Sequence, residues 1–186
     1  MLRIPLVIAI AVGLLTARLT FTEVQGSKKF KLAFSIFRGG VFFAFFFNPL
    51  IEQPRVLDVV SVKIFGLIAL TIGLVLACLG GNQLVKGELR GIKGIPDRLI
   101  TKGLYARIRH PVNLGLMLIF LGWYAIFPGI YSLMFLACLI TVLVIETFWE
   151  ERNLIKKFGN EYLEYKKNVG MFIPRRHARK GAEQSP

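Results

Sequence analysis

Polar residues that could bind a charged ligand gather in two stretches, each at the edge of a long apolar run. The first stretch, LITKGLYARIRHPVNLG, places Arg109 and His110 directly before Pro111. The second, WEERNLIKKFGNEYLEYKKNVGMFIP, opens with the paired acids Glu150 and Glu151. Proline is typical of the first turn of a helix, so the residues before Pro111 are expected at a helix N-terminus. The exposed N–H groups and the positive dipole end there favour anionic groups such as carboxylates.

The connection between two apolar runs predicts that the stretches meet. Residues 112–127 and 130–149 are separated only by Pro128-Gly129, a helix-breaking pair that favours a tight hairpin. Because the far ends of such a hairpin lie together, we expect the Arg109-His110 pair to approach the two glutamates. One interpretation is a set of ion pairs that anchors the hairpin. The other is a pocket for a ligand with both signs of charge, such as S-adenosylmethionine, which carries an ammonium, a sulfonium and a carboxylate.

The composition indicates an integral membrane protein. The 186 residues are 54% hydrophobic and 19% charged, and the apolar residues form long blocks. The net charge of +13 could suggest a nucleic-acid partner, but the basic residues lie between apolar blocks, where membrane orientation accounts for them. We therefore expect no nucleic acid. Cys78 and Cys138 fall inside apolar runs, and no His, Cys or Asp stands at ligand spacing from His110, so neither a disulfide nor a metal site is expected.

Hydropathy predicts an all-α bundle of about five membrane spans in a single domain covering residues 1–186. A bilayer core requires about 20 apolar residues per helix, and the runs that qualify are 2–21, 34–51, 59–80, 112–127 and 130–149. The first run could instead be a cleaved signal peptide, although no suitable cleavage site follows it. Aromatic residues at helical spacing predict an amphipathic helix over about 150–168. The tail, 177–186, has the composition of a disordered segment.

The charge distribution predicts the orientation of the bundle. Strongly basic connections, 22–33 and 81–111, and the basic tail alternate with weakly charged ones. The positive-inside rule then places the N-terminus outside and the C-terminus in the cytoplasm. Both polar stretches are therefore expected at the cytoplasmic face of a multi-pass protein, in a prokaryotic cell membrane or the endoplasmic reticulum.

Together the two stretches resemble the isoprenylcysteine carboxyl methyltransferase family and related membrane phospholipid methyltransferases. The family pattern runs G-x-Y-x-x-x-R-H-P-x-Y-x-G, then a hairpin, then E-E-x-x-L-x-x-x-F-G-x-x-Y-x-x-Y and a closing I-P. The first part is matched by Gly103, Tyr105, Arg109, His110, Pro111 and Gly115. The second part is matched by Glu150, Glu151, Leu154, Phe158, Gly159, Tyr162, Tyr165, Ile173 and Pro174. The likeness covers residues 99–174, the region that would carry catalysis.

The resemblance implies an S-adenosylmethionine-dependent methyltransferase that acts at the cytoplasmic membrane face on a lipophilic acceptor arriving from the bilayer. It implies a cofactor shell made of Tyr105, Arg109, His110, Pro111, Glu150, Glu151, Leu154 and Tyr162. On the catalytic side we expect Arg109, Asn113 and Glu146. Because the hairpin is expected to place these residues together, Glu150→Gln or Arg109→Ala is expected to abolish cofactor binding while the protein still inserts and folds.

Two departures from the pattern leave the acceptor open. Asn113 stands where the family has tyrosine, and Glu146 stands where the carboxyl methyltransferases have an arginine. An acid at that position favours a lipid amine over an isoprenylcysteine-type carboxylate, unless Glu146 is salt-bridged within the bundle. A membrane reductase or isomerase with a similar hairpin, or a non-catalytic membrane protein, remains an alternative. GGNQLVKGELRG lacks the strand context of a dinucleotide-binding loop. No residue pattern indicates an oligomeric state.

Overall fold

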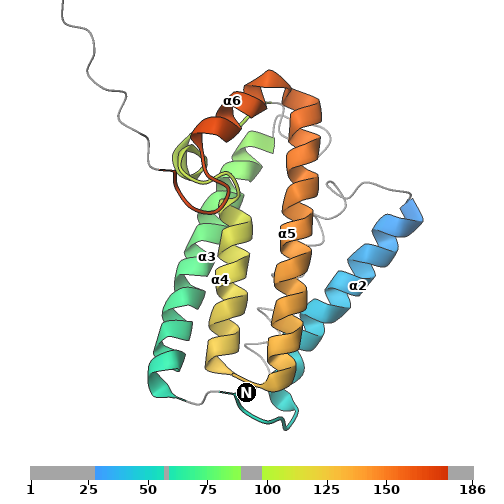
Figure 1. Ribbon diagram of the computed structural model, residues 1–186, viewed down its shortest axis with the longest axis vertical. Helices are drawn as coiled ribbons and strands as arrows, with labels where there is room; N and C mark the ends of the chain where they lie inside the picture. Colours follow the sequence, from blue (N-terminus) through green and yellow to red (C-terminus); the bar gives the residue numbers. More distant parts are fainter. Residues whose placement is uncertain (1–27, 57–58, 89–97, 176–186) are drawn as a thin grey trace, which may run out of the picture.

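The computed structural model describes residues 28–56, 59–88 and 98–175 (Figure 1). Every element in this part of the chain is helical, which confirms the all-α prediction. The elements are α2 (Lys28–Phe47), η1 (Asn48–Leu50), α3 (Val60–Glu88), η2 (Gly103–Ala106), α4 (Pro111–Ile126), α5 (Ile130–Phe158) and α6 (Asn160–Asn168). The predicted first span, 2–21, and the predicted disordered tail, 177–186, lie outside the described residues.

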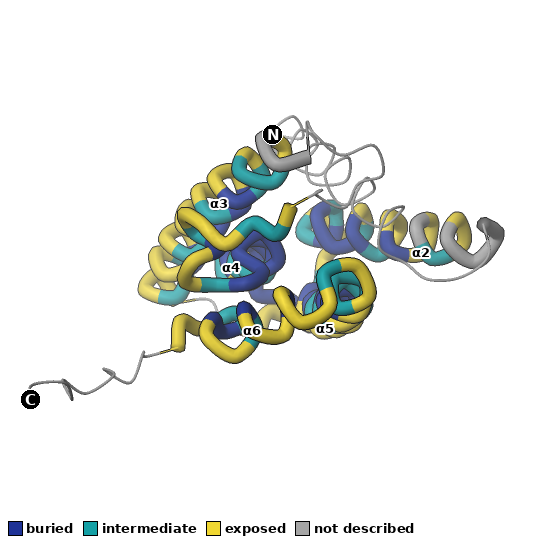
Figure 2. Tube along the Cα trace, turned by 90° about the horizontal axis from the view of Figure 1, so that it is seen from above, coloured by how far each residue is buried: buried dark blue, intermediate teal, exposed yellow. Residues whose placement is uncertain are grey.

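Among the described residues, three helices are long and apolar enough to cross a membrane: Leu32–Leu50, Val60–Val85 and Ile130–Phe158. The fourth apolar helix, α4, has 16 residues, so it is about 24 Å long, shorter than a bilayer core of about 30 Å. α4 lies between α3 and α5, and its residues are mostly buried, whereas the outer face of α3 is exposed (Figure 2). The described helices thus form an apolar bundle with α4 at its centre.

Two helices continue beyond their apolar runs. α3 extends to Glu88, past the predicted end at residue 80, and α5 extends to Phe158, past residue 149. The expectation of one amphipathic helix over 150–168 is therefore wrong. Gly159 separates α5 from α6 with φ +55°, a backbone conformation that glycine adopts readily and other residues rarely do. Hydropathy marks where a helix leaves the apolar layer, whereas the helix itself ends where the backbone turns.

Glycines bring α3 and α4 backbone to backbone. A Cβ atom on Gly73 would lie 2.6 Å from the carbonyl oxygen of Gly115, and one on Gly66 would lie 2.8 Å from that of Gly122. Small residues allow this close approach between membrane helices, where van der Waals packing drives association. Any larger side chain at these positions must push the two helices apart.

Aromatic side chains fill the space between α2 and α4. Phe42, Phe45 and Phe46 are buried against Phe120 and Trp123. The ring centroids of Phe46 and Trp123 are 5.0 Å apart, and those of Phe42 and Phe120 are 5.6 Å apart in an edge-to-face arrangement, a geometry that aromatic pairs prefer. The phenylalanine-rich run of α2 therefore packs as a core element, and this packing positions α2 against the hairpin.

Candidate functional site

The α4–α5 hairpin brings the two polar stretches together at the end of the bundle that carries α6 (Figure 1). Arg109 donates from Nε to Glu151 Oε1 at 2.9 Å and from Nη2 to the same oxygen at 2.6 Å. Their side chains are only 4% and 3% exposed. Lys166 of α6 donates to the other carboxylate oxygen of Glu151 at 2.6 Å. The expected approach of Arg109 to the glutamates is confirmed, and Glu151 is the acid at the centre of the ion-pair network.

His110 bridges the two glutamates. Its Nδ1 lies 3.0 Å from Glu150 Oε2 and its Nε2 lies 3.4 Å from Glu151 Oε1. Burial by itself lowers the pKa of this imidazole, but the two carboxylates outweigh it and raise the pKa to about 9. His110 is therefore an imidazolium at neutral pH and donates from both ring nitrogens.

α6 and the chain that follows it hold the Arg-His-Pro segment in place. The N–H of Arg109 donates to Gly170 O at 2.9 Å, and the N–H of His110 donates to Met171 O at 3.2 Å. Tyr165 donates from its hydroxyl to the Tyr105 carbonyl at 2.6 Å. Arg109 also donates from Nη1 to the Lys166 carbonyl at 3.2 Å. The first two bonds satisfy the N–H groups of Arg109 and His110 directly before α4, which would otherwise be unpaired.

Two small neighbouring cavities adjoin this network, with volumes of about 10 and 40 Å³. Both are lined by Leu84, Tyr105, Arg109 and Glu150. The smaller one is completed by His110, Val112 and Asn113, and the larger one by Leu99, Ile100, Leu154, Tyr162 and Tyr165. The walls thus combine one carboxylate, cations and aromatic and aliphatic surface, which is the mixture expected of a small-molecule site.

Tyr162 is the unusual residue of this site. It is fully buried, and its hydroxyl has no hydrogen-bond partner among the described residues. Burial and the Glu151 carboxylate raise the pKa of this phenol above its usual range, so the hydroxyl keeps its proton. Buried polar groups in folded proteins almost always have a partner. An unpaired hydroxyl on the wall of a cavity that Glu150 also lines points to a ligand that accepts a hydrogen bond there.

The two residues that depart from the family pattern both face partners within the bundle. Asn113 donates to the Thr147 hydroxyl at 3.0 Å, across the hairpin. Glu146 pairs with Arg38 of α2 at 2.7 Å, and both side chains are 7% exposed. Pro111 is buried at the start of α4, and Leu154 lines the larger cavity. Seven of the predicted site residues line the cavities: Tyr105, Arg109, His110, Asn113, Glu150, Leu154 and Tyr162. Glu146 and Glu151 line neither cavity.

Lys166 and Arg38 are site residues that sequence reasoning missed. Lys166 follows Tyr162 by four residues, so the two lie on one face of α6, and this spacing could have revealed it. Arg38 stands 108 positions from its partner Glu146, and no local pattern connects the two.

The chain matches the phospholipid methyltransferase family over residues 61–161, which is more than half of its length. The chain belongs to the phospholipid methyltransferase family. The match reaches from α3 through Glu161, so it includes α4, α5 and the first two residues of α6, whereas Tyr162, Tyr165 and Lys166 lie just beyond it. This membership confirms the resemblance that the two polar stretches carry.

Curated relatives support the same placement. The chain is 37% identical over 98 residues to methanethiol S-methyltransferase 1 of Bradyrhizobium diazoefficiens, covering 53% of this chain and 34% of the relative. It is also 37% identical over 82 residues to the protein-S-isoprenylcysteine O-methyltransferase of Saccharomyces cerevisiae, covering 41% and 32%. The chain thus spans about a third of the length of the curated relatives it matches. No solved structure matches it.

Proposed function

We propose that this chain is an S-adenosylmethionine-dependent methyltransferase that acts on a lipophilic acceptor at the cytoplasmic face of a membrane. One observation carries the proposal. The Glu150 side chain and the Tyr162 hydroxyl, which has no hydrogen-bond partner among the described residues, line the same cavity. Membership of a methyltransferase family and methyltransferases among the relatives support it over a reductase or an isomerase.

The residues around the cavities fit the chemical groups of S-adenosylmethionine. Glu150 is 24% exposed on its side chain and would attract the cationic end of the ligand. Tyr162 would donate to an acceptor atom, and Leu84, Leu99 and Leu154 would cover the apolar adenosyl surface. Since the cavities are only about 10 and 40 Å³, a ligand of this size requires lining side chains to move.

The ion-pair network gives these residues fixed positions. Arg109 and Lys166 neutralise Glu151, and protonated His110 holds the Glu150 carboxylate at 3.0 Å. When bound, the cofactor supplies an electrophilic methyl group on a sulfonium. The role of the protein is then to hold the reactants in line and exclude water, and such positioning can lower a barrier by about 7–11 kcal/mol.

The acceptor that the site supports best is a neutral nucleophile on a lipophilic molecule. Asn113, a neutral side chain hydrogen-bonded to Thr147, lines the smaller cavity, and Glu146 is matched by Arg38. This arrangement favours a thiol or an amine over a carboxylate, and several relatives are named as methanethiol S-methyltransferases. Both the acceptor and the cytoplasmic location of the site belong to the proposal.

Heat-stabilisation of the purified protein tests cofactor binding. S-adenosylhomocysteine should raise the melting temperature in detergent, NADPH should not, and Glu150→Gln should remove the shift. Lys156→Ala, which changes an exposed cation elsewhere on α5, serves as the control and should keep it. A shift with NADPH alone would overturn the proposal.

Transfer of a radiolabelled methyl group tests the acceptor class. The protein should label a lipophilic thiol or a lipid amine more readily than a prenylcysteine carboxylate. Labelling of the carboxylate alone would refute the assignment of a neutral nucleophile while leaving cofactor binding intact.

A further inference from the structure

The amide of Asn113 is held in one orientation by the neighbouring helix. Its Nδ2 donates to the Thr147 hydroxyl at 3.0 Å, and that hydroxyl donates to the Leu143 carbonyl at 2.7 Å. A hydroxyl has a single hydrogen, so Thr147 can only accept a bond from the amide. The Nδ2 side of Asn113 therefore faces α5, and its carbonyl oxygen, Oδ1, is directed away from Thr147.

Asn113 Oδ1 is an acceptor that has no hydrogen-bond partner among the described residues. Asn113 is only 8% exposed, and it lines the smaller cavity together with Arg109 and Glu150. Buried polar groups in folded proteins almost always have a partner. An open acceptor on a cavity wall therefore points to a ligand that supplies a hydrogen. In the adjoining cavity the open group is a donor, the Tyr162 hydroxyl, so the two cavities suit different ends of the reacting pair.

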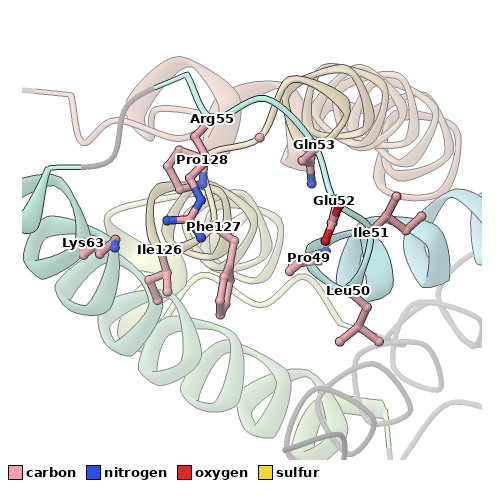
Figure 3. Close-up of a pocket in the computed structure, with 11 residues that line it drawn as sticks. Pro49, Leu50, Ile51, Glu52, Gln53, Arg55, Lys63, Ile126, Phe127 and Pro128 are labelled. Carbon is pink, nitrogen blue, oxygen red and sulfur yellow. The ribbon is translucent and has the colours of Figure 1, made fainter.

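The smaller cavity suits the reacting atom of the acceptor better than a much larger pocket elsewhere in the bundle. That pocket, of about 360 Å³, lies beside the α4–α5 turn, where Ile126, Phe127 and Pro128 line it (Figure 3). At about 1.5 Å per residue, Ile126 lies about 20 Å along α4 from Asn113. None of its lining residues lines the cavities near Glu150, so a nucleophile bound there would be far from the methyl donor.

We propose that Asn113 selects the methyl acceptor by accepting a hydrogen bond from its reacting atom, so that only a nucleophile with hydrogen on that atom is methylated. The inference rests on the proposed methyl transfer and narrows its acceptor: thiols and primary or secondary amines fit, whereas thioethers and tertiary amines do not. A site built to bind a hydrogen-bond donor discriminates strongly against analogues without one, because its buried polar group is then left unpaired. Since tyrosine stands at this position in the family pattern, the selection belongs to this chain.

Electrons and protons balance in this arrangement. A lone pair of the acceptor atom forms the bond to the methyl carbon, while the bond from that carbon to the sulfonium sulfur breaks and its electron pair stays on the sulfur. The acceptor atom then carries the positive charge and still holds its hydrogen. An amine keeps this proton as an ammonium ion, whereas a thiol gives it to the Glu150 carboxylate on the same cavity wall. The amide takes no proton, so Asn113 determines specificity without acting as a base.

Methyl transfer to matched pairs of acceptors tests the role of Asn113. Decanethiol and decyl methyl sulfide form one pair, and N-methyldecylamine and N,N-dimethyldecylamine form the other. The wild type should favour the hydrogen-bearing member of each pair. In Asn113→Leu, which keeps the side-chain size but has no acceptor, this preference should fall roughly 5- to 150-fold, as expected for one buried polar group left unpaired. Dividing the ratio in the variant by that in the wild type cancels the intrinsic reactivities of the probes.

A binding measurement separates selection from chemistry. With S-adenosylhomocysteine present, decanethiol should raise the melting temperature of the wild type more than decyl methyl sulfide does, and the two shifts should be equal in Asn113→Leu. Thr147→Val removes the hydroxyl that orients the amide but leaves Oδ1 in place, so it should weaken the preference less than Asn113→Leu does. Asn82→Leu replaces an exposed asparagine of α3 and is the matched control, which should behave as the wild type.

The failure of this inference differs from the failure of the proposed function. Equal preference ratios in the wild type and Asn113→Leu, with the S-adenosylhomocysteine shift kept by both, would overturn the role of Asn113 and leave methyl transfer standing. A wild type that methylates none of the probes and shows no S-adenosylhomocysteine shift would overturn the proposed function, and the role of Asn113 with it.

Discussion

Replacing Glu151 with glutamine should destabilise this protein far more than the same change at Glu150, although the two residues are adjacent. Glu151 is 3% exposed on its side chain and accepts two bonds from Arg109, which is 4% exposed. Removing one partner of a buried ion pair typically costs about 3–5 kcal/mol, because the remaining charge stays buried without compensation. The lost contact with Lys166, which is 40% exposed, adds at most about 1 kcal/mol.

Glu150→Gln should lower the free energy of unfolding by less than Glu151→Gln does. Glu150 pairs with His110, and its own side chain is 24% exposed, so water can compensate part of the loss. His110 can also release its proton when the carboxylate is gone, which avoids a buried lone charge. We expect a cost of about 1–2 kcal/mol, which this exposure places toward or below the lower end of the about 1.5–3 kcal/mol typical of a hydrogen bond to a charged group.

Thermal unfolding in detergent measures the difference. For a chain of this size, about 1 kcal/mol corresponds to roughly 2–4 °C, so Glu151→Gln should lower the melting temperature by roughly 6–24 °C and Glu150→Gln by roughly 2–8 °C. The argument would be refuted if Glu151→Gln melted no lower than Glu150→Gln. Loss of the S-adenosylhomocysteine shift in Glu151→Gln without a fall in melting temperature would make Glu151 a ligand contact instead of a structural acid.

Three further predictions concern stability. The two carboxylates raise the pKa of His110 above its ordinary 6.5 to about 9. The stability that protonated His110 contributes is therefore complete below about pH 6.5 and is lost as the pH rises through about 9. Melting temperatures should fall between pH 7 and pH 10, and this fall should be smaller in His110→Gln. Gly73→Ala should destabilise by about 1–3 kcal/mol, since the new Cβ would meet an α4 carbonyl at 2.6 Å, whereas Gly81→Ala, with open space around it, should be neutral or stabilise by up to about 1 kcal/mol. Arg38→Met should cost about 3–5 kcal/mol and Arg38→Met/Glu146→Met much less. A loss of stability in the double variant equal to the sum of the losses in Arg38→Met and Glu146→Met would show that the pair is not coupled.

Sequence reasoning succeeded where the relevant signal is local. The Pro128-Gly129 break predicts the hairpin, and the hairpin predicts that Arg109 and His110 meet the paired glutamates, as they do. It failed where the signal depends on the fold. The ends of α3 and α5 were misplaced because hydropathy follows the membrane layer, although the Gly159-Asn160 pair was a visible break signal for the second of them.

Partners distant in the chain could not be found in the same way. The Arg38–Glu146 pair joins α2 to α5 over 108 positions, and neither residue stands in a motif that names the other. The glycine contacts between α3 and α4 share this property, since Gly73 and Gly115 read as ordinary small residues until the helices are packed. The sequence therefore identifies which charged and small residues are present, whereas the structure is needed to show which of them contact each other across the fold.

The two buried acids of α5 together account for the direction in which Glu150 points. Glu146 pairs with Arg38 of α2, and Glu151 pairs with Arg109 before α4. Charges inside an apolar bundle are expensive without partners, so a rotation of α5 that broke either pair would be strongly disfavoured. Successive residues on a helix are about 100° apart. With Glu151 held against Arg109, Glu150 must face sideways, where it lines both cavities. Glu151, which forms a buried ion pair, and Glu150, which lines the cavities, can thus be adjacent in sequence because the helix directs their side chains to different sides.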